Sequence, residues 1–353
     1  MTIESKLTPQ EPKEPRKISR RNFLKSSVTA GIGAGLVLGG YDRISQKIRE
    51  FSNTYVQEGL PNVIEKMKTL YPAIDQWAKP EEWSAVIYEQ CKKNQLPLTQ
   101  ENLCLILAII GAESGFRASP RVVDFWMTPS EKFVGKLGIM KSKTSGAMEI
   151  TVQDIMDREK IGYNEALEEI SIIQAGIGFG IEHLKKIIDI YKNISDDNLR
   201  LKCIFADYNA GLFTSRNTGV QIILNKIGNF ALREDGLLFS QTEQAIKKLF
   251  LNHNISITTE QIKKDLLDRM NYEFSNSQTY QALMKLNGGN MPMKPADSPF
   301  LGFSSYIIKI FTGVGSSKEF AEHRLIEFNA IMELMLKEKQ NQMKSIKNNE
   351  EEF

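Results

Sequence analysis

LCLILAIIGAESGFRASP, residues Leu103 to Pro120, sets the structural class expected for the whole chain. Its first part is apolar with no wide polar face, a pattern that predicts a buried helix rather than a surface one. The run ends in one acid, Glu113, followed by Ser114 and a turn. Burial makes a carboxyl group costly unless it is hydrogen-bonded or used, and it raises the pKa of the acid. A general acid needs such a pKa near neutral pH, so Glu113 is a candidate catalytic acid.

Apolar residues recur at spacings of three and four along the chain, and no segment alternates convincingly with a period of two. This pattern predicts an all-α protein, with a helix near 152–156 and a longer one over 170–191. Residues suited to helix caps mark further boundaries. They are Thr99, Asp196 or Asp197, Gly211, Thr258 with Gln261, and Ser316 with Glu319.

The helix expected over 170–191 carries Gly176, Gly178 and Gly180 on or beside its apolar stripe. Glycine costs helix stability, so these residues predict close backbone contact with a neighbouring helix. Upstream of the apolar run, helical spacing predicts a set of packing positions. The set is Val63, Met67, Leu70, Trp77, Trp83, Ile87 and Cys91.

Composition excludes several classes of protein. The net charge of +2 gives no field strong enough to indicate nucleic-acid binding. Cys91, Cys104 and Cys203 are too few for a disulfide scaffold and are best explained as small buried hydrophobic residues. The three histidines are scattered and form no HExxH motif, so neither a metal site nor a cofactor is expected.

The amino terminus has the organisation of an export signal. A polar lead precedes SRRNFLK, Ser19 to Lys25, and an apolar, glycine-rich stretch of about 15 residues ends at Gly40. Arg20 and Arg21, with the weak hydrophobicity behind them, resemble the twin-arginine signal. The resemblance implies recognition by the twin-arginine export machinery and a periplasmic or cell-envelope location. Because no clear cleavage site precedes Tyr41, an uncleaved inner-membrane anchor is also open.

Three short patches follow in order: ESGF at Glu113, GAME at Gly146 and YNAG at Tyr208. Together they resemble the soluble lytic transglycosylases, whose lysozyme-like domain carries E-S-x-F, G-L-M-Q and A-Y-N-A-G motifs. Gly180, His183 and Leu184 fall where that family has a G-x-x-Y-L helix. The match covers roughly residues 99 to 215.

The resemblance implies cleavage of peptidoglycan glycan strands at the MurNAc-GlcNAc β-1,4 bond. Glu113 would act first as acid and then as base, without the second carboxylate that most glycosidases use. Ser114 would position the sugar or the acid, and Met148 would line the site. Tyr208 would hydrogen-bond the Glu113 carboxyl, and Asn209 would fix the turn around it.

Two positions depart from the family pattern. Glu149 stands where the family has Gln, and Ala147 stands where it has Leu. A second carboxylate would raise the pKa of Glu113 by like-charge repulsion, or activate a water and favour lysozyme-like hydrolysis. Alternatively, Glu149 points to solvent at a helix start, where the dipole favours an acid.

A second resemblance reaches further, to a family of bacterial envelope proteins, often lipoproteins, that share this core. It rests on FGIEHL, FADYNAG, DGLL, Ser215-Arg216-Asn217 and the proline after ESGF. We therefore expect a lysozyme-like core with helical extensions on both sides. The expected segments are a signal or anchor at 1–40, an N-terminal helical region at 41–98, the core at 99–225, a C-terminal helical extension at 226–336 and a charged tail at 337–353 that frays.

The long connection at 117–145 contains Phe125 and Trp126, which either line a sugar site or pack within a lid. The sequence thus predicts a peptidoglycan-cleaving enzyme, most simply a lytic transglycosylase. The alternative from a different class is a non-catalytic envelope protein that binds or scaffolds glycan, which the altered GAME patch and the 117–145 insertion favour.

Overall fold

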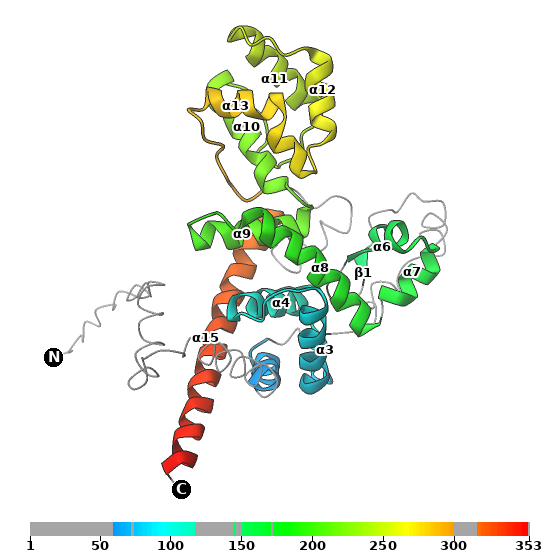
Figure 1. Cartoon of the computed structure of the whole chain (residues 1–353), viewed down its shortest axis with the longest axis vertical. Helices are drawn as coiled ribbons and strands as arrows, with labels where there is room; N and C mark the ends of the chain where they lie inside the picture. The colour runs from blue at the N-terminus through cyan, green and yellow to red at the C-terminus, as the bar shows by residue number, and fades with distance from the viewer. Residues whose placement is uncertain are drawn as a thin grey trace, which may run out of the picture. The chain divides into compact units, whose positions relative to one another are not determined.

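The computed structural model describes residues 59–71, 74–116, 144–145, 148, 150–170, 172–298 and 316–351 (Figure 1). The chain divides into two units, residues 1–51 and 52–353, and all described residues belong to the second. The predicted export signal at 1–40 lies outside the described residues, as do Phe125, Trp126, Ala147 and Glu149.

The regular secondary structure among the described residues is almost entirely helical, and the all-α class is confirmed. The two short strands β1 (Thr144–Ser145) and β2 (Ile150–Thr151) form one antiparallel pair, with Thr144 opposite Thr151. The helices are an unlabelled one at 59–70, α3 (Pro80–Lys93), α4 (Gln100–Glu113), α6 (Val152–Glu159), α7 (Tyr163–Ile170), α8 (Ile173–Tyr191), α9 (Asp197–Ala210), α10 (Thr214–Gly228), α11 (Ser240–Asn252), α12 (Thr259–Leu267), the 3-10 helix η2 (Tyr272–Asn276), α13 (Gln278–Leu286) and α15 (Ser317–Glu351).

The α4 helix is buried as its sequence predicted. Thr99 caps it by accepting a hydrogen bond from the backbone N–H of Asn102, and nine successive residues from Asn102 to Ile110 are buried. The long helix α15 packs against both α9 and α4 (Figure 1). A helix enclosed in this way needs no polar face, which explains its uniformly apolar sequence.

The helices pack around two hydrophobic clusters. The first combines apolar residues of the 59–70 helix, α3, α4, α8, α9 and α15. The second is built from α10, α11, α12, η2 and α13. The residues predicted as one C-terminal extension are thus distributed over both clusters, because α15 closes the first one with Phe328, Ile331 and Met335.

The predicted caps are confirmed. Asp196 accepts hydrogen bonds from the N–H groups of Asn198 and Leu199, and Gly211 ends α9 with a positive φ of 105°. Thr258 and Ser316 accept from the N–H groups three residues further on. The three cysteines are free and buried, as expected.

The glycines of α8 make room for side chains rather than for a helix backbone. A Cβ on Gly178 would lie 2.6 Å from Oε1 of Gln90 on α3. A Cβ on Gly180 would lie 2.5 Å from Cβ of Met148. The close approach at Gly178 and Gly180 is therefore to the side chains of Gln90 and Met148, and not the predicted contact with the backbone of a neighbouring helix.

The prediction of a frayed tail from Lys337 is wrong. The α15 helix continues to Glu351, and Glu338 is only 6 % exposed. Its carboxylate accepts hydrogen bonds from Asn62 (2.9 Å) and Lys66 (2.6 Å) of the 59–70 helix. A partly buried ion pair therefore holds the start of the segment that looked like a solvated charge run.

Two of the predicted packing positions are also wrong. Trp77 is 90 % exposed and Leu70 is exposed as well, whereas Trp83 and Ile87 are buried. Trp77 precedes Pro80, the first residue of α3, so it lies in a turn where helical spacing no longer determines which side chains are buried.

Candidate functional site

Glu113 is the last residue of α4, and the chain turns sharply after it. The carbonyl of Ile110 accepts hydrogen bonds from the N–H groups of Ser114 (3.1 Å) and Gly115 (3.0 Å) and from Oγ of Ser114 (3.1 Å). Gly115 and Phe116 then both adopt positive φ, 60° and 61°. The left-handed conformation is costly for Phe116 and needs support from its surroundings.

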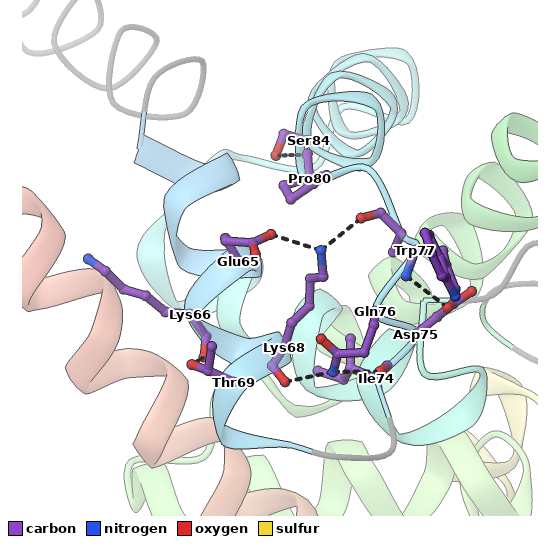
Figure 2. A network of polar contacts seen from close by, with 11 residues as sticks. Glu65, Lys66, Lys68, Thr69, Ile74, Asp75, Gln76, Trp77, Pro80 and Ser84 are labelled. Atoms are coloured by element: carbon purple, nitrogen blue, oxygen red, sulfur yellow. Dashed lines mark hydrogen bonds and ion pairs between the residues drawn. The ribbon is translucent and has the colours of Figure 1, made fainter.

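That support comes from residues before and within α3. The buried Phe116 ring contacts Trp83 edge-on, with 5.2 Å between ring centroids. The N–H of Asp75 donates a 2.7 Å hydrogen bond to the carbonyl of Gly115. The turn after Glu113 is thus fixed to the loop at 74–79, which Figure 2 shows in detail.

A second group of contacts joins the GAME patch, α8 and the YNAG patch. The Tyr208 hydroxyl donates a 2.8 Å hydrogen bond to the carbonyl of Met148. The Met148 side chain is fully buried against Gly180, and the Tyr208 ring meets His183 edge-on at 5.4 Å. Three segments that the sequence singled out separately therefore converge on one small cluster.

The other predicted site residues are distributed as follows. Glu113 is half-buried, Ser114 is buried with its hydroxyl bonded to its own helix, and Asn209 is exposed near the end of α9. Glu149 lies outside the described residues. The predicted pairing of Tyr208 with the Glu113 carboxyl stays a prediction.

Sequence reasoning missed a buried acid beside Tyr208. Asp207 is fully buried on α9 and accepts hydrogen bonds from the Tyr191 hydroxyl (2.5 Å), the Thr214 hydroxyl (2.7 Å) and the Ser215 N–H (2.7 Å). Burial raises the pKa of the Asp207 carboxyl, although these hydrogen bonds oppose the shift. Burial and the nearby Asp207 carboxyl also raise the pKa of Tyr191. An acid inside the apolar run CIFADY was the available signal.

The Ser215-Arg216-Asn217 patch has a structural role in the second cluster. Arg216 is buried, donates hydrogen bonds to the carbonyls of Arg269 (2.5 Å) and Asn271 (2.8 Å), and lies 4.2 Å from the centre of the Phe213 ring. Asn217 donates a further bond of 2.9 Å to the carbonyl of Arg269. Burial lowers the pKa of Arg216 to about 10. The patch therefore fixes α10 to the segment that follows α12.

Two cavities bounded by described residues stand out, and neither is lined by a predicted site residue. One of about 360 Å³ is bounded by α3, α6, α7 and α8 and is mostly polar, with Arg158 over the Phe179 ring at 4.9 Å. The other, of about 260 Å³, lies against α9, the loop before residue 298 and α15, and is lined by Lys202, Lys294 and Lys318.

The part of the chain that the structure describes contains neither a cluster of metal ligands nor a membrane-spanning helix. There, no group of three or more His, Cys, Asp or Glu side chains is arranged to hold a metal ion. Within the same residues, none of the helices combines the length and hydropathy needed to span a bilayer.

Comparison with known proteins gives one match. A family model described as a protein of unknown function (DUF1615) matches residues 76–151 and 128–298. The matched region includes Glu113, the GAME patch, Tyr208 and most of the second cluster. No match was found among curated proteins or among solved structures.

Proposed function

We propose that this chain cleaves peptidoglycan as a lytic transglycosylase, with Glu113 as its single acid and base. The chain belongs to the DUF1615 family of proteins of unknown function. The observation that carries the proposal is the hydrogen bond from Tyr208 to Met148. It brings together two of the three patches that resemble the transglycosylase motifs, which lie sixty residues apart in the chain.

The setting of Glu113 supports its role as an acid. The carboxyl group stands at the C-terminal end of α4, where the backbone carbonyls carry partial negative charge, and α4 has no basic residue in its last turn. Such a position favours the protonated form, which a general acid needs before it meets its substrate. The supported turn at Gly115 and Phe116 keeps this end of the helix in place.

The reaction would proceed in two steps. In the first, Glu113 donates its proton to the glycosidic oxygen, the bond from that oxygen to the muramyl C1 breaks, and the substrate's own N-acetyl group stabilises the cation. In the second, the muramyl C6 hydroxyl attacks C1 and gives its proton to the Glu113 carboxylate. The products are a shortened strand and a 1,6-anhydro ring, and the acid is regenerated.

Tyr208 would influence the protonation state of Glu113. A hydroxyl carries one proton, and that of Tyr208 is donated to the Met148 carbonyl. Tyr208 can therefore only accept a hydrogen bond from Glu113, which requires the protonated acid. This geometry would favour the form of Glu113 that is ready to donate.

Ala147 and Glu149 favour a second candidate, because they replace the Leu and Gln of the family motif. One consequence would be a glycan-binding or scaffolding protein that retains the helices without the chemistry. Another would be a hydrolase in which Glu149 activates a water, as in glycosidases with two carboxylates. The products of the reaction separate all three candidates.

The test is incubation of the purified protein with peptidoglycan sacculi, followed by mass spectrometry of the soluble products. We expect 1,6-anhydromuropeptides from the native chain and at least about a hundredfold fewer from Glu113→Gln, as for loss of a general acid. Glu82→Gln, at an exposed position of α3, is the matched control. Reducing-end products would instead identify a hydrolase, and sacculi left intact but bound by both proteins would support the binding function.

We also propose that the chain is exported to the periplasm or cell envelope by the twin-arginine machinery, on the strength of Arg20 and Arg21. Replacing both residues with Lys should leave the protein in the cytoplasmic fraction, because that machinery reads the arginine pair. Export of this variant at the native level would contradict the proposal.

A further inference from the structure

Trp77 presents a large aromatic surface to solvent on a well-supported loop. Its side chain is 90 % exposed, while Ile74 and Ala78 on either side of it are buried. Exposed tryptophan is unfavourable in water, because most of the indole surface is apolar. The exposure is not a consequence of a loose chain end, since the loop on both sides is packed into the first cluster.

Hydrogen bonds hold the backbone around Trp77 (Figure 2). The Trp77 N–H donates to Oδ1 of Asp75 (3.0 Å), and the Ala78 N–H donates to the Asp75 carbonyl (3.1 Å). Gln76 reaches back with its amide to the carbonyl of Lys68 (3.0 Å). These bonds form a compact turn that fixes the backbone position from which the Trp77 side chain extends.

A buried cation reinforces the turn. Lys68 is buried, and its ammonium group donates to Glu65 (2.9 Å) and to the carbonyl of Ala78 (3.2 Å), the residue after Trp77 (Figure 2). Removing a lysine from water is costly and is offset here only by these two partners. The chain thus uses a charged side chain to hold the segment that displays Trp77.

The same loop is attached to the turn that follows the candidate acid. The N–H of Asp75, two residues before Trp77, donates to the carbonyl of Gly115, two residues after Glu113. Motion of the loop relative to the end of α4 is therefore restricted. A ligand resting on Trp77 would therefore keep a fixed position relative to the end of the helix that carries Glu113.

The surroundings of Trp77 favour a sugar over a protein. Lys79 and Glu81 are exposed and lie two and four residues after Trp77, so a donor and an acceptor are close to the indole along the chain. The apolar C–H face of a pyranose ring can rest on an indole while its hydroxyl groups bond to such neighbours. A protein-binding hot spot is more often enclosed by further contacts that exclude water.

We propose that Trp77 is a stacking platform for a sugar ring of the peptidoglycan glycan strand, in a subsite beside the Glu113 end of α4. The proposal rests on the function proposed above and adds a binding residue that the transglycosylase-like motifs do not contain. Because the backbone that carries the indole is already held in place, binding a sugar there orders only the side chain of Trp77.

The experiment measures binding in a Glu113→Gln background, so that no glycan is cleaved, with the full chain. Trp77→Ala is compared with its parent by co-sedimentation with sacculi and by fluorescence titration with the tetramer of N-acetylglucosamine. We expect about tenfold weaker binding from Trp77→Ala and a change within about twofold from Trp77→Tyr, which keeps an aromatic face. The fluorescence blue shift on binding should disappear with Trp77.

Phe239→Ala is the matched control. Phe239 is also an exposed aromatic residue, and it directly precedes α11, a helix of the second cluster. Its binding should equal that of the parent. Thermal unfolding of all variants should be unchanged, since both side chains are exposed. In the active protein, Trp77→Ala should raise KM for soluble uncrosslinked glycan strands and leave kcat nearly unchanged, as expected for loss of uniform binding.

The outcomes separate this inference from the proposed function. Cleavage of soluble glycan strands with native KM in Trp77→Ala overturns the platform and leaves the enzyme. Binding that depends on Trp77 without any cleavage by the native chain supports the platform and overturns the enzyme. No binding of either glycan probe overturns both. Loss of binding to phosphatidylglycerol vesicles, with glycan binding intact, would assign Trp77 to a membrane surface and also overturn the platform.

Discussion

The hydroxyl of Tyr208 donates a 2.8 Å hydrogen bond to the backbone carbonyl of Met148, and both groups are buried. Tyr208→Phe would leave that carbonyl without its donor in the interior of the first cluster. We expect the free energy of unfolding to fall by about 1–2 kcal/mol, as for an unsatisfied buried acceptor. Under the proposed function, release of anhydromuropeptides should also fall, by about tenfold. Urea unfolding and the sacculus assay measure the two effects.

Tyr272→Phe is the control for this prediction. Its hydroxyl makes a longer bond, 3.5 Å to the carbonyl of Lys186, at an exposed position. Loss of such a contact should change the free energy of unfolding by less than about 0.5 kcal/mol. Equal destabilisation by the two variants would mean that the Tyr208 bond has no special importance for stability.

Gly180 provides the space that Met148 occupies. A Cβ there would lie 2.5 Å from Cβ of Met148, an atom fixed close to the backbone, so the chain itself must shift. We expect Gly180→Ala to lower the free energy of unfolding by about 1–3 kcal/mol, in spite of the better helix propensity of alanine. Thermal unfolding provides the measurement.

Gly178→Ala is a matched comparison in the same helix with the same gain in propensity. Its Cβ would meet the end of the flexible Gln90 side chain, which can move aside. This variant should be close to native in stability. If Gly178→Ala proved the more damaging of the two, the packing of Met148 on α8 would be less tight than the distances indicate.

Local signals in the sequence were sufficient to predict most helices and their ends. The apolar run before Glu113 and the caps at Thr99, Asp196 and Gly211 depend on residues a few positions apart, so they were readable without a structure. The helical class followed from the same information.

What could not be predicted depends on partners remote in the chain. Glu338 looked like part of a solvated charge run because its partner Lys66 lies 272 residues earlier. The partner of Tyr208 is a backbone carbonyl, which every residue possesses, so no motif could identify it. Trp77 continued an apolar spacing across a turn, and only the packing of the loop revealed its exposure.

Asp207 should make stability depend on pH. Burial raises the pKa of its carboxyl above the ordinary value of 3.8, so the folded chain holds the Asp207 proton more tightly than the unfolded chain does. Its contribution to the free energy of unfolding should therefore decrease as pH rises above about 4. Asp207→Asn cannot ionise, and its amide can still bond to Tyr191, Thr214 and Ser215.

Urea unfolding of the native chain and of Asp207→Asn at intervals from pH 4 to pH 7 tests this effect. The native chain should lose stability relative to the variant as pH increases. Asp207→Ala, which removes the acceptors, should be less stable than both throughout, by about 2–4 kcal/mol. If the difference in free energy of unfolding between the native chain and Asp207→Asn stayed constant from pH 4 to pH 7, it would contradict the raised pKa of Asp207.

Glu338 should show the opposite dependence. Burial alone would raise the pKa of its carboxyl, but hydrogen bonds from Lys66 and Asn62 outweigh burial and lower it below 4.5. A lowered pKa stabilises the fold at pH values above the unfolded-state pKa, and this contribution is lost as pH falls through the folded-state pKa.

Glu338→Gln should therefore lower the free energy of unfolding by about 1 kcal/mol at pH 7. The effect is modest because the Lys66 side chain is 43 % exposed. As pH falls through the lowered pKa of Glu338, the native chain and the Glu338→Gln variant should converge, whereas Glu333→Gln, at an exposed position of α15, should match the native chain at every pH. A deficit of Glu338→Gln that persists at low pH would show that packing, rather than the charge on Glu338, joins α15 to the 59–70 helix.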